Sequence, residues 1–262
     1  MTKSSKTETV HVAIKNLSVI WKQSQRPFNE QWAKQIAQEF DTDKFDMPVI
    51  TKSNGAGFYH IVEGQHRVAA AKIAFGETEQ LACRMVDAED PARAAEIWLG
   101  INSGRKATKP VQRFEVSVTA GREPQTEINN LVKRLGYHVS AYKTDHSISA
   151  VSSLIWVHNR FGVTILKNTL VMLDKTWTGD PAAFGGDTIK GYSVFINEFH
   201  PYLDNKRLAE VIAKVFTPNK LLAAGRLYSE QNIVSVVDGV SEVLRSKYNF
   251  KLRDEKLRLK RK

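Results

Sequence analysis

Residues 61–71 read Ile-Val-Glu-Gly-Gln-His-Arg-Val-Ala-Ala-Ala, and this stretch decides the fold of the first part of the chain. Ile61 and Val62 close an apolar run that is typical of a strand. Gly64 interrupts that run, and the alanine-rich stretch after it favours a helix. The sequence therefore predicts a strand that turns into a helix at this glycine, with three polar side chains at the turn, Gln65, His66 and Arg67.

Such a turn has the features of an anion site. The first amide groups of a helix have no partner inside the helix, and the helix dipole is positive at that end. Gly64 permits close approach of the backbone, and His66 and Arg67 add an imidazole and a guanidinium. The sequence predicts a phosphate site here. The alternative is that Gly64 only makes a tight turn and that the polar side chains are solvated.

Outward from this turn, strand and helix patterns alternate. Period-two alternation and turn residues predict strands, whereas apolar residues four positions apart predict helices. We expect an α/β domain over residues 1–109, with strands at 8–14, 47–51, 58–62 and 79–86 and helices at 28–40, 65–75 and about 91–100.

From Pro110 onward the patterns are mainly helical. We expect an all-α domain over residues 110–250, followed by a basic tail over 251–262. The predicted helices are about 110–120, 125–135, 146–160, 162–177, 205–215, 218–228 and 230–247. An aromatic and leucine stripe predicts core positions at Trp156, Phe161, Leu166, Leu170, Leu173 and Trp177.

Composition limits the class of protein. The chain of 262 residues has 42% hydrophobic residues, as soluble globular proteins do. No apolar run approaches the roughly 20 residues that cross a bilayer, and the N-terminus lacks the apolar segment of a signal peptide. The single Cys83 excludes an intramolecular disulfide and a cysteine-based zinc cluster. We expect a cytoplasmic protein with no membrane partner.

Positive charge is concentrated toward the C-terminus. Residues 121–262 contain 22 Lys and Arg against 14 Asp and Glu, out of 38 and 28 in the whole chain. Such a basic segment favours DNA as the partner, because phosphate contacts release counterions. The alternative is a solvated helix end. The candidate DNA-binding residues are Lys251, Arg253, Lys256, Arg258, Lys260 and Arg261.

Residues 128–140 also carry a helix, a Leu-Gly step and a serine, a pattern that opens many helix-turn-helix units. The next predicted helix begins too late for a tight turn. The alternative is a pair of ordinary packed helices.

Three short motifs, taken in order, resemble those of the ParB-like N-terminal domain. Gly64-Gln65-His66-Arg67 resembles the second motif, Gly-Glu-Arg/His-Arg, and also the Asp-Gly-Gln-His-Arg motif of phage, plasmid and DNA-modification proteins. Ser24-Gln25-Arg26-Pro27 before a helix resembles the first motif. Ile101-Asn102-Ser103-Gly104-Arg105, with Pro110 beyond it, resembles the third. The resemblance covers roughly residues 8–120 and implies a ParB/sulfiredoxin-like α/β fold followed by a helical domain.

The resemblance implies a cleft for a nucleoside triphosphate (CTP or ATP), with Mg²⁺ as a further expected ligand and a second copy of the chain as a further partner. Three arginines in one cleft suit a polyphosphate, because each forms bidentate charge-assisted bonds. The residues that match the family's binding positions are Arg26, Gly64, Gln65, His66, Arg67, Asn102 and Arg105.

The motifs also depart from the family pattern. Gln65 and Ile101 stand where the family has glutamates, so carboxylates that would anchor Mg²⁺ are missing and hydrolysis is in doubt. Glu63 is the nearest carboxylate. It either holds a metal, acts as a base with His66, or points away at the strand end. Sulfiredoxin chemistry is rejected because its nucleophilic cysteine is replaced by Gln65.

Three functions remain open. The first, which we favour, is a nucleotide- or phosphate-binding DNA-binding protein of plasmid or phage type. The second is an enzyme on the same cleft, a metal-dependent nuclease or a phosphotransferase. The third is a non-catalytic protein-interaction module.

Overall fold

The structure, a computed structural model, describes residues 8–53, 57–103, 109–142, 144–252 and 256–257. The chain divides into two compact units, Met1–Arg122 and Glu123–Lys262. The division follows α4 (Pro110–Thr119), whereas the predicted domain boundary precedes it. The reason is that α4 packs on α3 (Pro91–Ile101) through Val116.

The first unit is built on a mixed five-stranded sheet in the order β1-β5-β3-β4-β2. The β1–β5 and β3–β4 pairs are antiparallel, and the β3–β5 and β2–β4 pairs are parallel. All four predicted strands are confirmed, and the two-residue β2 is too short to show a sequence pattern. The strands are β1 (Glu8–Ala13), β2 (Leu17–Ser18), β3 (Val49–Lys52), β4 (Tyr59–Glu63) and β5 (Gln80–Met85).

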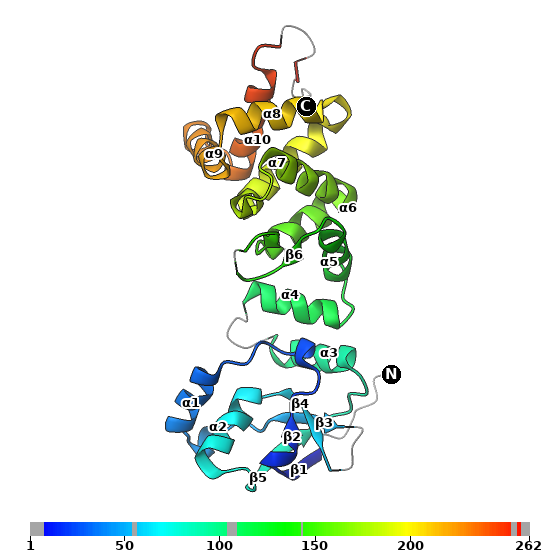
Figure 1. Ribbon diagram of the computed structural model, residues 1–262, viewed down its shortest axis with the longest axis vertical. Coiled ribbons are helices and arrows are strands. Elements are labelled where there is room, and N and C mark those ends of the chain that lie inside the picture. Colours follow the sequence, from blue (N-terminus) through cyan, green and yellow to red (C-terminus); the bar gives the residue numbers. More distant parts are fainter. Residues whose placement is uncertain (1–7, 54–56, 104–108, 143, 253–255, 258–262) are drawn as a thin grey trace. The chain divides into compact units, whose positions relative to one another are not determined.

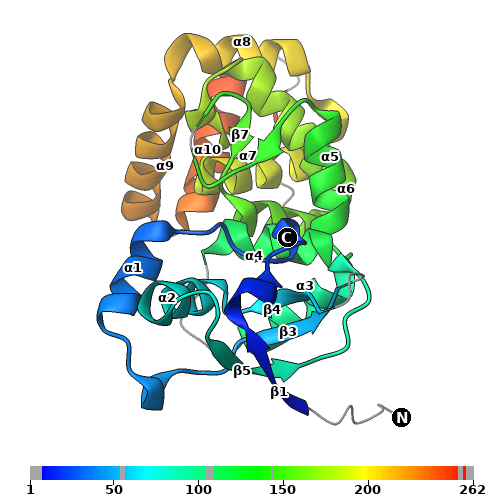
Figure 2. The ribbon, with the colours of Figure 1, turned by 60° about the horizontal axis from the view of Figure 1, so that its bottom comes forward.

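Alternation along β4 explains why helices cover both faces of this sheet. Ile61 packs in one buried cluster with Val68 of α2 (Gln65–Phe75). Its neighbour Val62 packs in a different cluster with Ala94 of α3. Successive side chains of a strand point to opposite faces, so α2 and α3 lie on opposite faces. Helix α1 (Glu30–Gln38) lies beside α2 (Figures 1 and 2).

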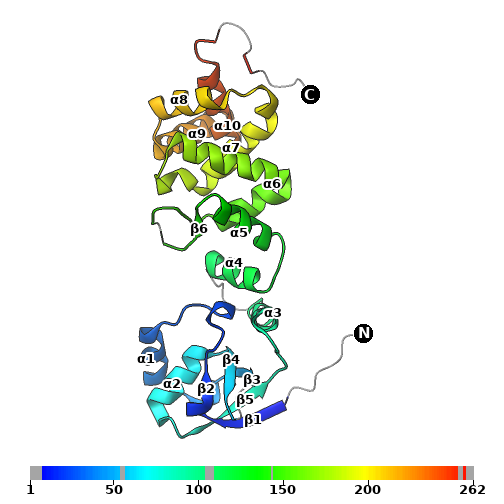
Figure 3. The same cartoon turned by 45° about the vertical axis from the view of Figure 1, so that its right-hand side comes forward.

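The second unit is mainly helical, as predicted. It also contains one short parallel strand pair that was not predicted. In Figure 3, α10 lies against both α7 and α9. The predicted break at Gly162 is a kink within α6, where this residue has φ +82°. The helices are α5 (Gln125–Arg134), α6 (Val151–Thr176), α7 (Gly186–Phe199), α8 (Asn205–Val215), α9 (Pro218–Asn232) and α10 (Val236–Asn249).

Several predictions for this unit are wrong. The tight turn of a helix-turn-helix is absent after α5, because β6 (His138–Val139) pairs with β7 (Ser147–Ile148) before α6 begins. Helix α7 was not predicted, although its buried Tyr192, Phe195 and Ile196 recur at helical spacing. The predicted helix over 230–247 is interrupted, since α9 and α10 are separate helices.

The predicted core stripe is confirmed for its leucines and wrong for its aromatic residues. Leu166, Leu170 and Leu173 are buried. Trp177 is half-buried, and its indole Nε1 donates to the Phe216 carbonyl at 2.8 Å. Trp156 and Phe161 are also half-buried. Across the described part of the chain, no helix combines the length and apolar character needed to span a membrane.

Candidate functional site

The turn between β4 and α2 needs a glycine. Gly64 has φ +101°, a backbone conformation that side-chain-bearing residues rarely adopt. A Cβ atom at this position would lie 3.2 Å from both the Cα of Pro48 and the Nη2 of Arg67. Its carbonyl accepts from the Val68 amide at 3.0 Å, which begins the helix. The predicted strand-glycine-helix turn is therefore confirmed, and the chain packs closely around it.

A cavity of about 330 Å³ opens at this turn. It brings together Arg26 of the first motif and Gly64, Gln65, His66 and Arg67 of the second, as the sequence predicts. Glu63 also lines it, so this carboxylate does not point away. The remaining lining residues are Gln25, Trp32, Ile36, Asp46 and Trp98.

Arg67 is held by two carboxylates. Its Nη2 donates to Glu63 Oε2 in a close ion pair, and its Nη1 lies 3.6 Å from Asp46 Oδ2. Nη1 also donates to the Asp46 carbonyl at 2.5 Å. The Glu63 side chain is only 5% exposed and that of Arg67 only 17%. This buried pair fixes the arginine at the start of α2 and neutralises most of its charge.

His66 is a buried, neutral imidazole. Its Nε2 accepts a hydrogen bond from the Asn29 amide at 2.9 Å, and its ring packs between Phe28 and Trp32. Burial lowers its pKa to about 4, and the positive charge of Arg26 contributes. The other buried histidine of this unit, His60, also has a pKa of about 4, because of burial.

These two histidines predict acid sensitivity in the first unit. Their folded pKa of about 4 lies below the ordinary histidine pKa of 6.5, so the unfolded chain binds more protons below pH 6.5. Lowering the pH from 7 to 5 is expected to cost about 2 kcal/mol of unfolding free energy per histidine. Hydrogen exchange of peptides from the first unit measures this. His66→Gln should lose about half of the pH dependence, and exposed His11→Gln none. Equal pH dependence in both variants would contradict the assignment.

Hydrogen bonds join the first motif to the second motif and to the strand before it. Gln65 Nε2 donates to the Arg26 carbonyl at 2.6 Å, and Gln25 Nε2 donates to the Ile61 carbonyl of β4. The Arg26 guanidinium lies over the Trp32 ring, 4.7 Å from its centroid. Burial lowers the pKa of Arg26, which Glu63 opposes. Gln65 therefore links the first motif to the second. This role could not be predicted from the replacement of the family's glutamate by glutamine.

The third motif is only partly described. Asn102 ends α3, and its Nδ2 donates to the Trp98 carbonyl at 2.9 Å. It is not among the residues described as lining the cavity. Arg105 lies outside the described residues. No described residue of the third motif lines the cavity, and α3 contributes Trp98, which lies one turn before the motif.

The basic tail is also partly described. Leu257 is buried, and its backbone makes two hydrogen bonds of 2.8 Å to the Asn249 side chain at the end of α10. This part of the tail therefore packs on the second unit. Lys251 and Lys256 are exposed, and the other candidate DNA-binding residues lie outside the described part, namely Arg253, Arg258, Lys260 and Arg261.

Besides Gln25, which the first motif contains but which was not predicted as a site residue, sequence reasoning missed four residues that line the cavity. Trp32 and Ile36 come from α1, Trp98 comes from α3, and Asp46 comes from the segment before β3. Trp32 and Ile36 did have a signal, because they share one face of the predicted helix over 28–40. Asp46 had no sequence signal, because it lies 21 residues before Arg67 in the chain and contacts it only in the folded protein.

Within the described residues, no group of three His, Cys, Asp or Glu side chains is arranged to hold a metal ion. Glu63 and Asp46 are the carboxylates at the cavity. Two carboxylates suit a Mg²⁺ ion that arrives with a polyphosphate, because Mg²⁺ binds through one or two carboxylates together with phosphate oxygens.

These features define an α/β unit with a charged cavity at a strand-to-helix glycine turn, followed by a helical unit. Residues 21–261 match a family of unknown function (DUF6551), and the chain belongs to this family. No curated protein matches its sequence.

Two solved structures are similar to this chain. One is the C-terminally truncated chromosome-partitioning protein ParB from Caulobacter crescentus complexed with CTP-gamma-S. The match has 16% identity and a TM-score of 0.33, and covers 71% of this chain and 98% of that one. The other is the same truncated protein complexed to the centromeric parS site. That match has 15% identity and a TM-score of 0.36, and covers 90% and 99% of the two chains.

Proposed function

We propose that this chain is a DNA-binding protein whose first unit binds the phosphates of a nucleoside triphosphate at the start of α2. The observation that carries the proposal is the cavity at Gly64, which gathers the arginines of two separate motifs against a helix N-terminus. The ordered resemblance of the motifs to the ParB-like domain supports the same ligand.

The phosphate would meet donors of two kinds. The first amides of α2 have no partner inside the helix, and Gly64 and Gln65 at this helix start line the cavity. Arg26 supplies a guanidinium that makes no ion pair with a described residue. Arg67 supplies a second guanidinium, which is ion-paired with Glu63 and also lines the cavity. Trp32, Ile36 and Trp98 provide an apolar wall for the rest of the ligand.

The same geometry favours binding over cleavage. Glu63 is engaged by Arg67, and Gln65 is engaged by the Arg26 carbonyl. His66 uses its Nε2 lone pair to accept from Asn29, so that nitrogen is occupied. A general base needs a free lone pair within reach of its substrate. A catalytic role for Glu63 and His66 stays a prediction, and no contact among the described residues favours it.

A thermal-shift panel of nucleoside triphosphates, with and without Mg²⁺, tests the ligand. A ligand that binds only the folded state raises the melting temperature. At a ligand concentration of 100 times its Kd, the free energy of unfolding rises by roughly 2.7 kcal/mol. We expect a shift with at least one triphosphate, larger than with the free nucleoside. Arg26→Gln should remove most of it, and Lys52→Gln, an exposed change elsewhere in this unit, should not. A panel without any shift would reject nucleotide binding.

DNA binding is proposed for the basic second half of the chain, where Lys and Arg outnumber Asp and Glu by 22 to 14 over residues 121–262. Each phosphate contact contributes about −0.9 to the slope of log affinity against log salt. Replacing Arg258, Lys260, Arg261 and Lys262 with serine is therefore expected to make the slope less negative by about 3 to 4.

The measurement is fluorescence anisotropy of a duplex of mixed sequence over a salt series. A matched control removes four exposed cations from the first unit, Lys44, Lys52, Arg93 and Arg113, and should leave the slope unchanged. If both variants bind with the slope of the unmodified chain, DNA binding does not depend on the tail.

A further inference from the structure

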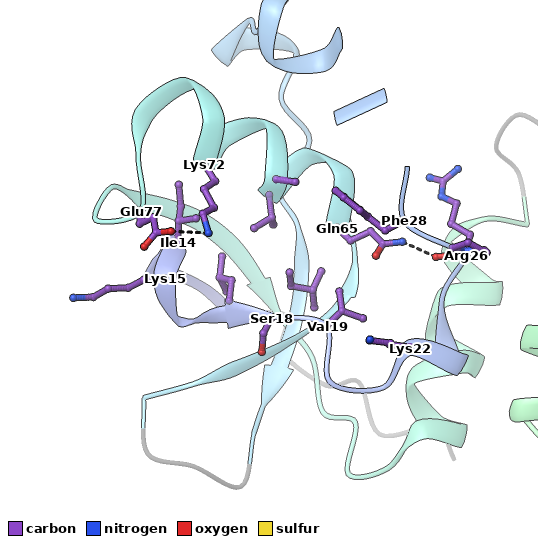
Figure 4. A pocket seen from close by; sticks show the side chains of 15 residues that line it. Ile14, Lys15, Ser18, Val19, Lys22, Arg26, Phe28, Gln65, Lys72 and Glu77 are labelled. Atoms are coloured by element: carbon purple, nitrogen blue, oxygen red, sulfur yellow. Dashed lines mark hydrogen bonds and ion pairs between the residues drawn. The ribbon is translucent and has the colours of Figure 1, made fainter. Parts of the chain in front are cut away.

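A second cavity of about 580 Å³ lies along α2 in the first unit (Figure 4). It shares only Arg26 and Gln65 with the cavity at the glycine turn. Otherwise it runs along the helix positions Val68, Ala69 and Lys72, which face the segment from Ile14 to Phe28. Apart from these two shared residues, the proposed nucleotide site does not use this space.

Its floor is aliphatic. Ile61 and Val68 belong to the buried core, so the floor is a fixed surface of the folded unit. Ligand sites of roughly 300–1,000 Å³ in proteins are mainly apolar, with a few polar groups that orient the ligand. The apolar side chains of this floor are Ile14, Leu17, Val19, Ile61, Val68 and Ala69.

Phe28 closes one end of the cavity. One face of its ring stacks on His66, with centroids 5.1 Å apart and an interplanar angle of 20°. The residue is nevertheless 52% exposed, although it is a large aromatic side chain. Because its position is set by His66, Phe28 offers a pre-oriented ring edge or face to a ligand body.

The rim is positive. Four cations and one carboxylate line the cavity. At one end Lys72 pairs with Glu77 at 2.6 Å, and Lys15 points away from the cavity in Figure 4. At the Phe28 end Lys22 turns its ammonium toward the apolar floor and makes no ion pair with any described residue (Figure 4). This end of the cavity therefore has both an aromatic ring and a positive charge that makes no ion pair with a described residue.

We infer that this cavity binds a small organic anion with an aromatic body. The body lies on the aliphatic floor against Phe28, and its carboxylate, sulfonate or phosphate group pairs with Lys22. Charge complementarity selects the anion, and the size of the cavity selects a ligand of one or two fused rings. This site is separate from the proposed nucleotide site, and it does not depend on that proposal.

The probe for this site is 8-anilinonaphthalene-1-sulfonate, an aromatic sulfonate of suitable size. Calorimetric titration of the full chain is expected to give one site per chain, and probe fluorescence should rise on binding. Lys22→Glu is expected to weaken binding at least tenfold, because it reverses the charge at the anion position. Lys52→Glu makes the same charge change away from the cavity and should bind as the unmodified chain does.

A second variant tests the floor. Ala69→Phe places a ring in the cavity from the half-buried face of α2, and should abolish probe binding while the circular dichroism spectrum stays unchanged. Nucleotide-induced thermal shifts should persist in this variant, which separates the two sites. Probe binding that neither variant weakens would overturn the inference. So would displacement of the probe by a short DNA duplex, since the groove would then serve nucleic acid.

Discussion

Arg67→Ala is expected to abolish the nucleotide-induced thermal shift and to lower the free energy of unfolding of the first unit by about 3–5 kcal/mol, because removing one partner of a buried ion pair takes the close counter-charge away from the other. The charge left behind is Glu63, whose side chain is 5% exposed. The loss should therefore exceed that of an exposed pair such as Lys34 and Glu30, whose attraction is screened by solvent.

Loss of binding and loss of stability can be separated with a second substitution. Glu63→Gln removes the buried charge, so the double variant Glu63→Gln with Arg67→Ala should recover a large part of the stability. It should not recover nucleotide binding, because the guanidinium is still absent. Glu63→Gln alone frees Arg67 and should bind nucleotide at least as tightly as the unmodified chain.

Urea unfolding, followed by hydrogen exchange of peptides from each unit, gives the stability of the first unit in all four proteins. Thermal shift with the best triphosphate gives the binding. The assignment of Arg67 fails if Arg67→Ala keeps the full nucleotide shift. The account of the ion pair fails if Glu63→Gln does not improve the stability of Arg67→Ala.

The first unit follows from local signals to a large extent. Gly64 at the end of an apolar run predicted the turn, and that residue does adopt the conformation that favours glycine. Period-two alternation predicted β1, and strand-like stretches next to turn residues predicted β3, β4 and β5. These signals succeed because each depends on residues within a few positions of one another.

The lining of the cavity could be predicted only where a motif carried it. Arg26 and Arg67 were placed by motif order, whereas Asp46 and Trp98 reach the cavity through the packing of elements distant in sequence. The ion pair between Glu63 and Arg67 could not be predicted from the sequence either. Glu63 lies four residues before Arg67, but β4 ends between them, so helical spacing does not apply. The pair forms because the glycine turn folds the strand end back beside the helix start.

The second unit was predicted less well for a related reason. Its helices α7, α9 and α10 contact one another through glycines, which lower helix propensity and weaken the sequence pattern. Gly191 and Gly225 both face Val240, and Gly239 faces the Gly225 backbone. Tertiary packing therefore overrides local propensity at these positions.

Gly239→Ala is expected to destabilise the second unit by more than about 3 kcal/mol, which is above the usual range for overpacking. The added Cβ would lie 2.2 Å from the Gly225 carbonyl oxygen and 3.2 Å from the Ser229 amide nitrogen. Both are backbone atoms of α9, so no side-chain rotation relieves the contact. Helices α9 and α10 would have to move apart, and the buried Val240 and Leu244 would lose contacts on the same face.

Two controls make this prediction specific to backbone contact. Gly100→Ala, in α3, places its Cβ where it meets no neighbouring atom of the described residues within 4 Å, so alanine should be neutral or stabilise by up to about 1 kcal/mol through helix propensity. Gly191→Ala meets the Val240 side chain at 2.4 Å, so adding Val240→Ala should restore part of its loss. The same addition should not rescue Gly239→Ala, because its nearest neighbour is a carbonyl oxygen. Rescue in both cases, measured by hydrogen exchange of second-unit peptides, would mean that the helices are held apart by Val240 and not in backbone contact.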